Sequence, residues 1–225
     1  MAQRRVCVFI DGANFNSLVL GKLQIKVADF DLNSFVQSLV PQDSILVGKK
    51  YYLGTVSKKD EKILRIFAAD QKSQLDSLEE NGFFVHTATL RRRLERVIVD
   101  ERVKNFVQLQ SQGIMLFKYV RLREKGIDVK IAVDLLSGAY ENEFSEAIIV
   151  SSDTDLIPAI MIIRERLYKK VTYIGFAIPD PAGEDHTEPT RAMLYSTDRQ
   201  KIFGPADLQR HTHPKINTMC ARQTD

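Results

Sequence analysis

Short apolar runs bounded by polar residues recur along the chain and predict strands, of which residues 5–10 and 147–150 are predicted to be buried. These runs are residues 5–10, 44–52, 83–85, 114–120, 147–150 and 171–176. Segments with apolar residues at helical spacing separate most of them, as in residues 58–81, where such residues are Ile63, Ile66, Phe67, Leu75 and Leu78. Strands alternating with helices predict an α/β fold with a mainly parallel sheet and helices on both faces.

The remaining segments give weaker signals. Helices are predicted directly after residue 11, and over the segments 30–40, 128–138, 156–167 and 191–195. Asp31 is a plausible helix cap and Pro41 a stop signal. Residues 89–113 fit either a helix or a pair of strands, residues 177–189 predict a loop, and residues 201–203 predict a short docking segment.

Acidic residues follow several of the predicted strands. The apolar run 147–150 ends in Ser151, Ser152, Asp153, Thr154 and Asp155. The first strand is followed by Asp11, and Asp128 opens a helix. A single aspartate in such a place is most often a helix cap. Four at three junctions of one sheet edge would repel one another, so we expect a divalent cation, Mg²⁺ or Mn²⁺, among them.

Composition and charge narrow the class of protein. The chain has 225 residues, 44% of them hydrophobic, which suits one domain with a sizeable core. The net charge is +3, but residues 91–130 alone hold eleven Lys/Arg and five Asp/Glu. Such a segment suits nucleic acid or an ordinary solvated helix face.

The cysteines and the apolar runs indicate a compartment. Cys7 and Cys220 show no metal-ligand spacing and predict no disulfide framework. We find no secretory signal ahead of Val6 and no run long enough to span a bilayer, so a cytoplasmic protein without a membrane partner is expected.

Three motifs in order resemble the NYN domain of the PIN-like nuclease superfamily, in its LabA-like branch. They are Phe9-Ile10-Asp11-Gly12-Ala13-Asn14, then Lys125-Gly126-Ile127-Asp128-Val129 with Val133-Asp134-Leu135, then Ser152-Asp153-Thr154-Asp155-Leu156. The resemblance extends from about residue 5 to residue 207 and includes the closing segment 194–207. Residues 89–113 depart from it, because they form a basic insertion longer than is usual in the family.

The resemblance implies a three-layer PIN-like (Rossmannoid) sandwich over residues 1–208. Residues 209–225 are polar, and this composition predicts a poorly ordered C-terminal tail. It implies a metal-dependent ribonuclease that hydrolyses phosphodiester bonds. The metal and catalytic carboxylates carried over by position are Asp11, Asp128, Asp153 and Asp155. Asn14 would be their polar neighbour, and Asp134 also matches the family pattern, although its place on another helix face leaves a structural role open.

The neighbouring residues suggest further roles. Ser151, Ser152 and Thr154 could orient the metal ligands. Either Asp155 or Asp128 could accept the proton of the attacking water. Basic residues near the site could bind phosphates, and these are Arg91, Arg92, Arg93, Arg121, Arg123 and Lys125. RNA is therefore the expected partner, with DNA and a second copy of the chain as alternatives.

Other functions fit the same residues less well or remain open. A haloacid dehalogenase phosphatase needs a second aspartate two residues after the first, where this chain has Ala13. A dinucleotide-binding protein needs a Gly-x-Gly-x-x-Gly motif, and a P-loop protein needs Gly-Lys-Ser/Thr; neither motif occurs. An RNA-binding module without catalysis and a regulatory scaffold of the same fold both remain open.

Overall fold

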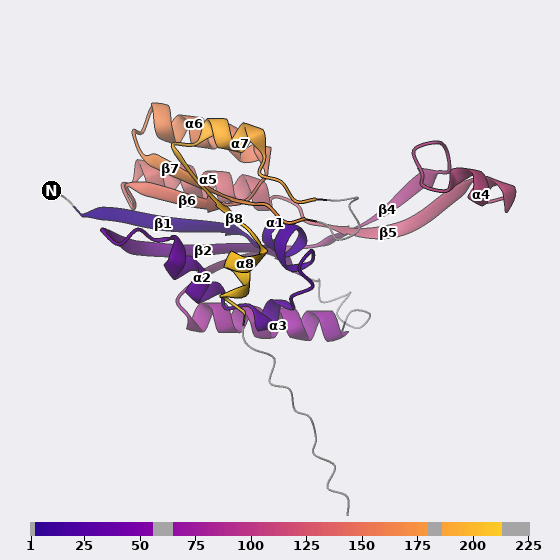
Figure 1. Cartoon of the computed structure of the whole chain (residues 1–225), viewed down its shortest axis with the longest axis horizontal. Coiled ribbons are helices and arrows are strands. Elements are labelled where there is room, and N and C mark those ends of the chain that lie inside the picture. The colour runs from indigo at the N-terminus through magenta and orange to yellow at the C-terminus, as the bar shows by residue number, and fades with distance from the viewer. Residues whose placement is uncertain (1–2, 56–64, 180–185, 213–225) are drawn as a thin grey trace, which may run out of the picture.

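A six-stranded sheet forms the centre of the molecule, which we describe from a computed structural model for residues 3–55, 65–179 and 186–212 (Figure 1). The strand order is β3-β2-β1-β6-β7-β8, and neighbouring strands are parallel throughout. The strands are β1 (Arg4–Asp11), β2 (Ser44–Thr55), β3 (Phe84–Thr89), β6 (Glu146–Val150), β7 (Lys170–Phe176) and β8 (Arg199–Phe203). The order reverses between β1 and β6, and ligands of open α/β sheets bind beyond the strand ends at such a point.

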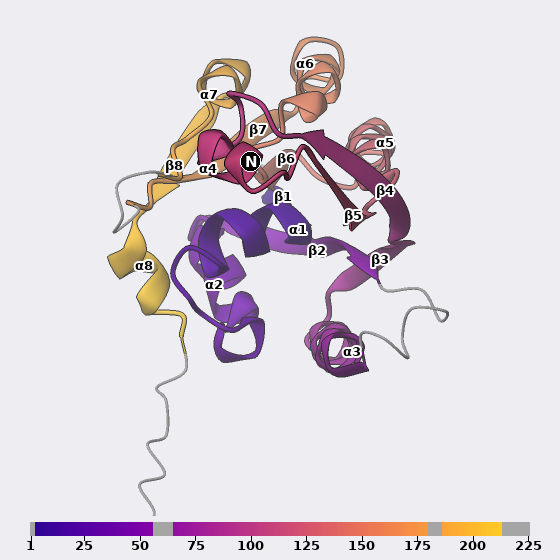
Figure 2. The ribbon, with the colours of Figure 1, turned by 90° about the vertical axis from the view of Figure 1, so that its right-hand side faces the viewer.

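Helices cover both faces of this sheet, so the fold is the expected three-layer α/β sandwich. Viewed along the strands, α5, α6 and α7 lie on one face, and α1, α2 and α3 lie on the other (Figure 2). The helices are α1 (Gly12–Phe15), η1 (Asn16–Leu20), η2 (Val27–Asp29), α2 (Leu32–Leu39), α3 (Arg65–Glu80), α4 (Phe106–Ser111), α5 (Ile127–Tyr140), η3 (Thr154–Leu156), α6 (Ile157–Glu165), α7 (Arg191–Ser196) and α8 (Pro205–Gln209).

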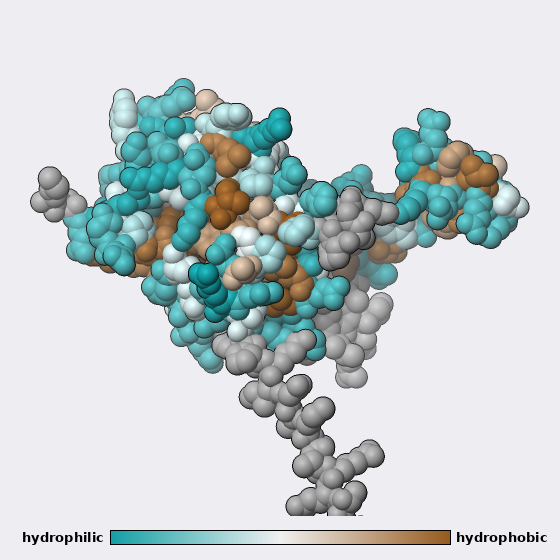
Figure 3. Space-filling model, in the orientation of Figure 1, coloured by the Kyte–Doolittle hydropathy of each residue, from teal (hydrophilic) through white to brown (hydrophobic). Residues whose placement is uncertain are grey.

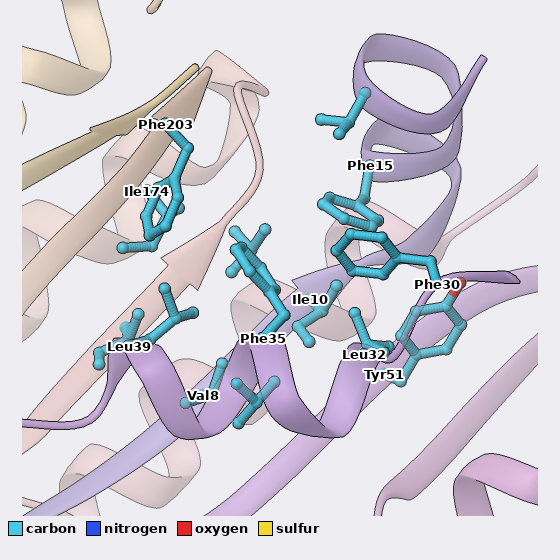
Figure 4. Packing of buried hydrophobic residues seen from close by; sticks show 14 of the residues in the cluster. Val8, Ile10, Phe15, Phe30, Leu32, Phe35, Leu39, Tyr51, Ile174 and Phe203 are labelled. Carbon is cyan, nitrogen blue, oxygen red and sulfur yellow. The ribbon is translucent and has the colours of Figure 1, made fainter. Parts of the chain in front are cut away.

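Two hydrophobic clusters hold the layers together. In the first, the ring of Phe35 on α2 lies 5.6 Å from that of Phe15 and 5.3 Å from that of Phe203 (Figure 4). The second lies between the sheet and α5 and α6, and includes Phe9 and Ile131. Each such buried side chain contributes about 1.5–3 kcal/mol to stability. Both clusters include residues of β1 and β6, so they hold in place the strand ends at which the candidate site lies.

A two-stranded antiparallel ribbon projects from the body of the protein. It consists of β4 (Arg91–Ile98) and β5 (Leu116–Arg123), which pair with each other and not with the central sheet. Together with α4 at its tip, this ribbon forms residues 91–123, which we call the arm. The arm leaves the body at the end where β1 passes into α1 (Figure 1).

Most of the predicted elements are present, with instructive differences. Asp31 caps α2 by accepting a hydrogen bond from the Ser34 backbone N–H over 2.8 Å, as predicted. The docking segment predicted at residues 201–203 is wrong, because these residues belong to edge strand β8. Within the predicted helix 58–81, α3 occupies Arg65–Glu80, while residues 58–64 lie outside the described part of the chain.

The packed part of the chain continues to Thr212, which bridges Phe30. The ring of His211 lies 6.2 Å from that of Phe30 and 5.6 Å from that of Phe35. Disorder predicted from Gln209 onward is therefore wrong for these last described residues. Across the described ranges, none of the helices combines the length and the apolar character that crossing a bilayer requires.

Candidate functional site

The ends of the two central strands meet through Asp11 and Ser151. Ile10 pairs with Val150, so the next residue of each strand lies at the carboxyl edge of the sheet. Ser151 Oγ donates a hydrogen bond to Asp11 Oδ2 over 3.1 Å, and the Asn14 backbone N–H donates to Asp11 Oδ1 over 3.0 Å. Asp11 is only 5% exposed. It therefore acts as the cap of α1 and as a link between strands.

Asn14 extends this link to the neighbouring loop. Its side-chain Oδ1 accepts the backbone N–H of Ser152 over 3.0 Å. The Ser152 hydroxyl lies 3.0 Å from the hydroxyl of Tyr173, and the Ser152 carbonyl accepts a hydrogen bond from Thr190 Oγ1 over 3.1 Å. Asn14 and Ser152 thus orient the segment that carries Asp153.

Three of the predicted carboxylates come together. Among the described residues, Asp128, Asp153 and Asp155 each place one carboxylate oxygen within 4.8 Å of the others. Asp128 lies in the first turn of α5, and Asp153 caps η3 by accepting the Asp155 backbone N–H over 2.8 Å. The three aspartates therefore converge from α5 and from the loop after β6.

This group has the chemistry of a divalent-cation site. Mg²⁺ binds carboxylate oxygens at about 2.1 Å, so oxygens sharing one ion lie at most about 4.2 Å apart. The observed 4.8 Å limit leaves only small side-chain rotations to be made. The residues present thus fit such an ion. Asp11 lies outside the group of three, so it differs from the other predicted ligands.

Burial and the neighbouring acids both raise the pKa values of Asp11 and Asp128. Burial raises the pKa of Asp11 to about 6, and the charges of Asp128 and Asp153 act in the same direction. Burial also raises the pKa of Asp128, helped by the charges of Asp153 and Asp155. A proton or a cation relieves such repulsion between carboxylates.

A fifth acid, Glu124, was missed by the sequence analysis. Its Oε1 accepts the backbone N–H of Gly54 over 2.5 Å at the end of β2. Burial raises its pKa, and the charges of Asp11 and Asp128 add to this rise. A Cβ on Gly54 would collide with the side chains of Glu124 and Leu90 as they are placed, so glycine permits this close approach. The sequence signal was one acid among the basic residues 121–125, directly after a predicted strand.

Asp134 lies elsewhere, although the family pattern includes it. Its Oδ2 accepts a hydrogen bond from the Tyr52 hydroxyl over 2.9 Å, and its Oδ1 pairs with Lys130 Nζ at 2.5 Å. Tyr52 is fully buried. These contacts join α5 to β2 beneath the site and favour the structural role that the sequence analysis left open.

The predicted phosphate-binding residues lie on and beside the arm. Arg91, Arg92 and Arg93 are exposed on β4. Arg121 and Arg123 on β5 both pair with Glu95, at 3.7 and 2.8 Å. Exposed positions are also found for Lys125, between β5 and α5, and for Thr154 in η3.

The comparisons with known proteins place this architecture in a family. The model of the NYN domain matches residues 5–189. No match was found among curated proteins. The chain is similar to a solved protein of unknown function, VPA0982 from Vibrio parahaemolyticus, with 18% identity and a TM-score of 0.54 over 92% of this chain and 96% of that one. That likeness supports the fold alone. NYN domains are a PIN-like family of nucleases, and the chain belongs to the NYN domain family.

Proposed function

We propose that this protein is a metal-dependent ribonuclease of the LabA-like branch, which hydrolyses phosphodiester bonds at the carboxyl edge of its sheet. The convergence of Asp128, Asp153 and Asp155 within 4.8 Å supports this proposal most directly. The basic residues beside these acids supply the charge that a polyanionic substrate requires. DNA remains an alternative substrate that the same residues could bind.

Asp128, Asp153 and Asp155 would hold Mg²⁺ or Mn²⁺. Such an ion polarises a phosphodiester and makes a nearby water more acidic. Asp155 is the exposed member of the three, so it is best placed to accept a proton from the attacking water. Asp11, Asn14 and Ser151 position the ligand loop through the hydrogen bonds between β1 and β6.

Arg121, Arg123 and Lys125 lie on the chain just ahead of Asp128 and would pair with phosphate oxygens of the bound strand. Their guanidinium and ammonium groups neutralise the charge that the acidic site would otherwise repel. The distribution of charge therefore matches a substrate whose scissile phosphate enters among carboxylates while its flanks lie on cations.

Purified protein incubated with labelled RNA in Mn²⁺ tests this proposal. Cleavage that is abolished by chelator, and by Asp153→Asn, is the expected result. Asn keeps an oxygen that can accept the Asp155 N–H, so the fold should persist, and circular dichroism checks this. Asp43→Asn, an exposed acid ahead of β2, is the matched control and should leave cleavage unchanged.

RNA binding without cleavage under any divalent ion would favour the alternative of a catalytically inactive binding module. Undiminished cleavage by the Asp153→Asn variant would instead remove the assignment of these carboxylates.

A further inference from the structure

The arm carries most of the positive charge of the protein. Its strands β4 and β5 contain seven Lys/Arg and one acid, Glu95. Residues 91–123 as a whole hold nine Lys/Arg and three Asp/Glu, a balance of +6 in a chain of net charge +3, so the rest of the chain sums to −3. Hydrophobic residues gather towards the tip of the arm, with hydrophilic residues around them (Figure 3).

The strand register places like charges opposite one another. Arg91 pairs with Arg123, Arg93 with Arg121, and Arg96 with Lys118. Like charges directly opposite destabilise a β-ladder, and an isolated two-stranded ribbon is only marginally stable.

Within the arm, few groups relieve this repulsion. Glu95 pairs with Arg121 and Arg123, and the Tyr119 hydroxyl donates to it over 2.8 Å. Among the described residues, no ion pair involves Arg93, Arg96 or Lys118.

Side chains alternate between the two faces of the ribbon, so the Arg91–Arg123 and Arg93–Arg121 pairs share one face with Glu95, and the Arg96–Lys118 pair lies on the other. Neither β4 nor β5 places an acid on that second face. The Arg96–Lys118 pair is therefore best explained by a polyanion that lies along this face of the ribbon.

The base of the arm is fixed to the sheet edge that holds the site. The Leu90 backbone N–H donates to the Thr55 carbonyl over 2.8 Å just before β4, and Glu124 accepts the Gly54 N–H just after β5, at the same end of the ribbon. Four residues after Glu124 comes Asp128. A nucleic-acid strand that extends from the three carboxylates would therefore reach the base of the arm directly.

The rung formed by Arg96 and Lys118 lies farther out. The base of the arm, at the level of Arg123, is five residue steps from Lys118, which is about 17 Å along the axis of the ribbon. Stacked nucleotides rise about 3.4 Å each, so this distance corresponds to about five nucleotides.

We propose that the arm binds the flank of a nucleic-acid strand and that Arg96 and Lys118 form its outer contact. This inference rests on the proposed function and adds a substrate requirement to it. Strands extending about five nucleotides or more beyond the cleaved bond are bound and cut well, whereas shorter ones miss the outer contact. Exposed apolar residues between the basic rungs, Leu94 and Val120, face the same side as Arg96 and Lys118 and contact sugars and bases.

The double variant Arg96→Glu and Lys118→Glu tests the inference. Labelled RNA of 4 and of 20 nucleotides is the probe, with anisotropy in chelator for affinity and cleavage in Mn²⁺ for kcat/KM. For the 20-mer, we expect both the affinity and kcat/KM of the variant to fall about tenfold or more. For the 4-mer, we expect both quantities to change less than twofold. The variant Arg96→Gln and Lys118→Gln removes the two positive charges without adding negative ones, so it should show the same pattern more weakly.

A matched control places the same charge change on the body. Lys72→Glu and Arg166→Glu alter exposed residues of α3 and of the end of α6, and should leave both lengths unaffected. If the wild type binds and cuts both lengths equally, the inference is wrong while the proposed function stands. If neither length is cut but binding keeps its length dependence, the arm assignment stands and the ribonuclease proposal fails. A change of mass in light scattering, with RNA affinity unaltered, would show that the arm binds a second copy of the chain and overturn the inference.

Discussion

Ser151 Oγ donates a hydrogen bond to Asp11 Oδ2 over 3.1 Å and so connects residues 140 positions apart in the chain. The bond fixes the ends of β1 and β6 against each other at the point where the strand order reverses. Asp11 thus accepts hydrogen bonds from Ser151 and Asn14 on its two carboxylate oxygens and lies outside the group of Asp128, Asp153 and Asp155. The site therefore contains one acid in a supporting position and three acids that converge on one another.

Asp11→Asn should stabilise the metal-free protein at neutral pH. Burial raises the folded pKa of Asp11 to about 6, above an ordinary value of 3.8. Between these values the folded protein keeps a proton that the unfolded chain has lost, so the free energy of unfolding falls as pH rises. The variant should lack this fall and be up to about 3 kcal/mol more stable at pH 7.

Urea denaturation in chelator at pH 4 and pH 7 measures this difference. The prediction fails if wild type and variant show the same change in unfolding free energy between the two pH values. Cleavage in Mn²⁺ should drop in the variant, because Asp11 positions the ligand loop.

Asp134 should matter for stability more than for activity. Asp134→Ala leaves the buried hydroxyl of Tyr52 without its acceptor and should lower the free energy of unfolding by about 1–3 kcal/mol. Asp134→Asn keeps an acceptor and should retain cleavage within about twofold. Thermal unfolding and kcat/KM for both variants distinguish the roles. Loss of activity in the Asn variant without loss of stability would point to a catalytic role.

Glu124 should act as an anchor for the base of the arm. Glu124→Gln keeps an oxygen for the Gly54 N–H, whereas Glu124→Ala removes it and should cost about 1–2 kcal/mol of stability. The Gln variant should keep its Mn²⁺ dependence, measured as cleavage rate against metal concentration. A large rise in the Mn²⁺ concentration needed by the Gln variant would instead identify Glu124 as a metal ligand.

Arg91→Glu together with Arg92→Glu should weaken RNA binding, and more so at low salt. Both residues are exposed at the base of the arm. A protein with fewer cations releases fewer counterions from the RNA when it binds, so the dependence of affinity on salt concentration should become shallower. Anisotropy titrations at two salt concentrations measure this change. Equal affinity of variant and wild type at both would assign the segment another role, such as dimerisation.

Local patterns explain why much of the fold could be predicted from the sequence. The apolar run 147–150 and the cap at Asp31 depend on residues close in the chain, and both appear as predicted. Residues 199–203 gave no clear strand pattern, because four of the five side chains of β8 are exposed at a sheet edge. Residues 89–113 were ambiguous because the pairing partner of β4 comes after α4 and the turn beyond it.

The sequence by itself determined that acids follow the strands near Asp11 and Asp153, and that cations cluster after residue 90. Only the tertiary structure decided that Asp128 joins Asp153 and Asp155 while Asp134 pairs with Tyr52. The physical reason is that spacing along a helix fixes which face a side chain occupies, but strand order and register fix what that face meets. The same register turned scattered basic residues into facing pairs along the arm.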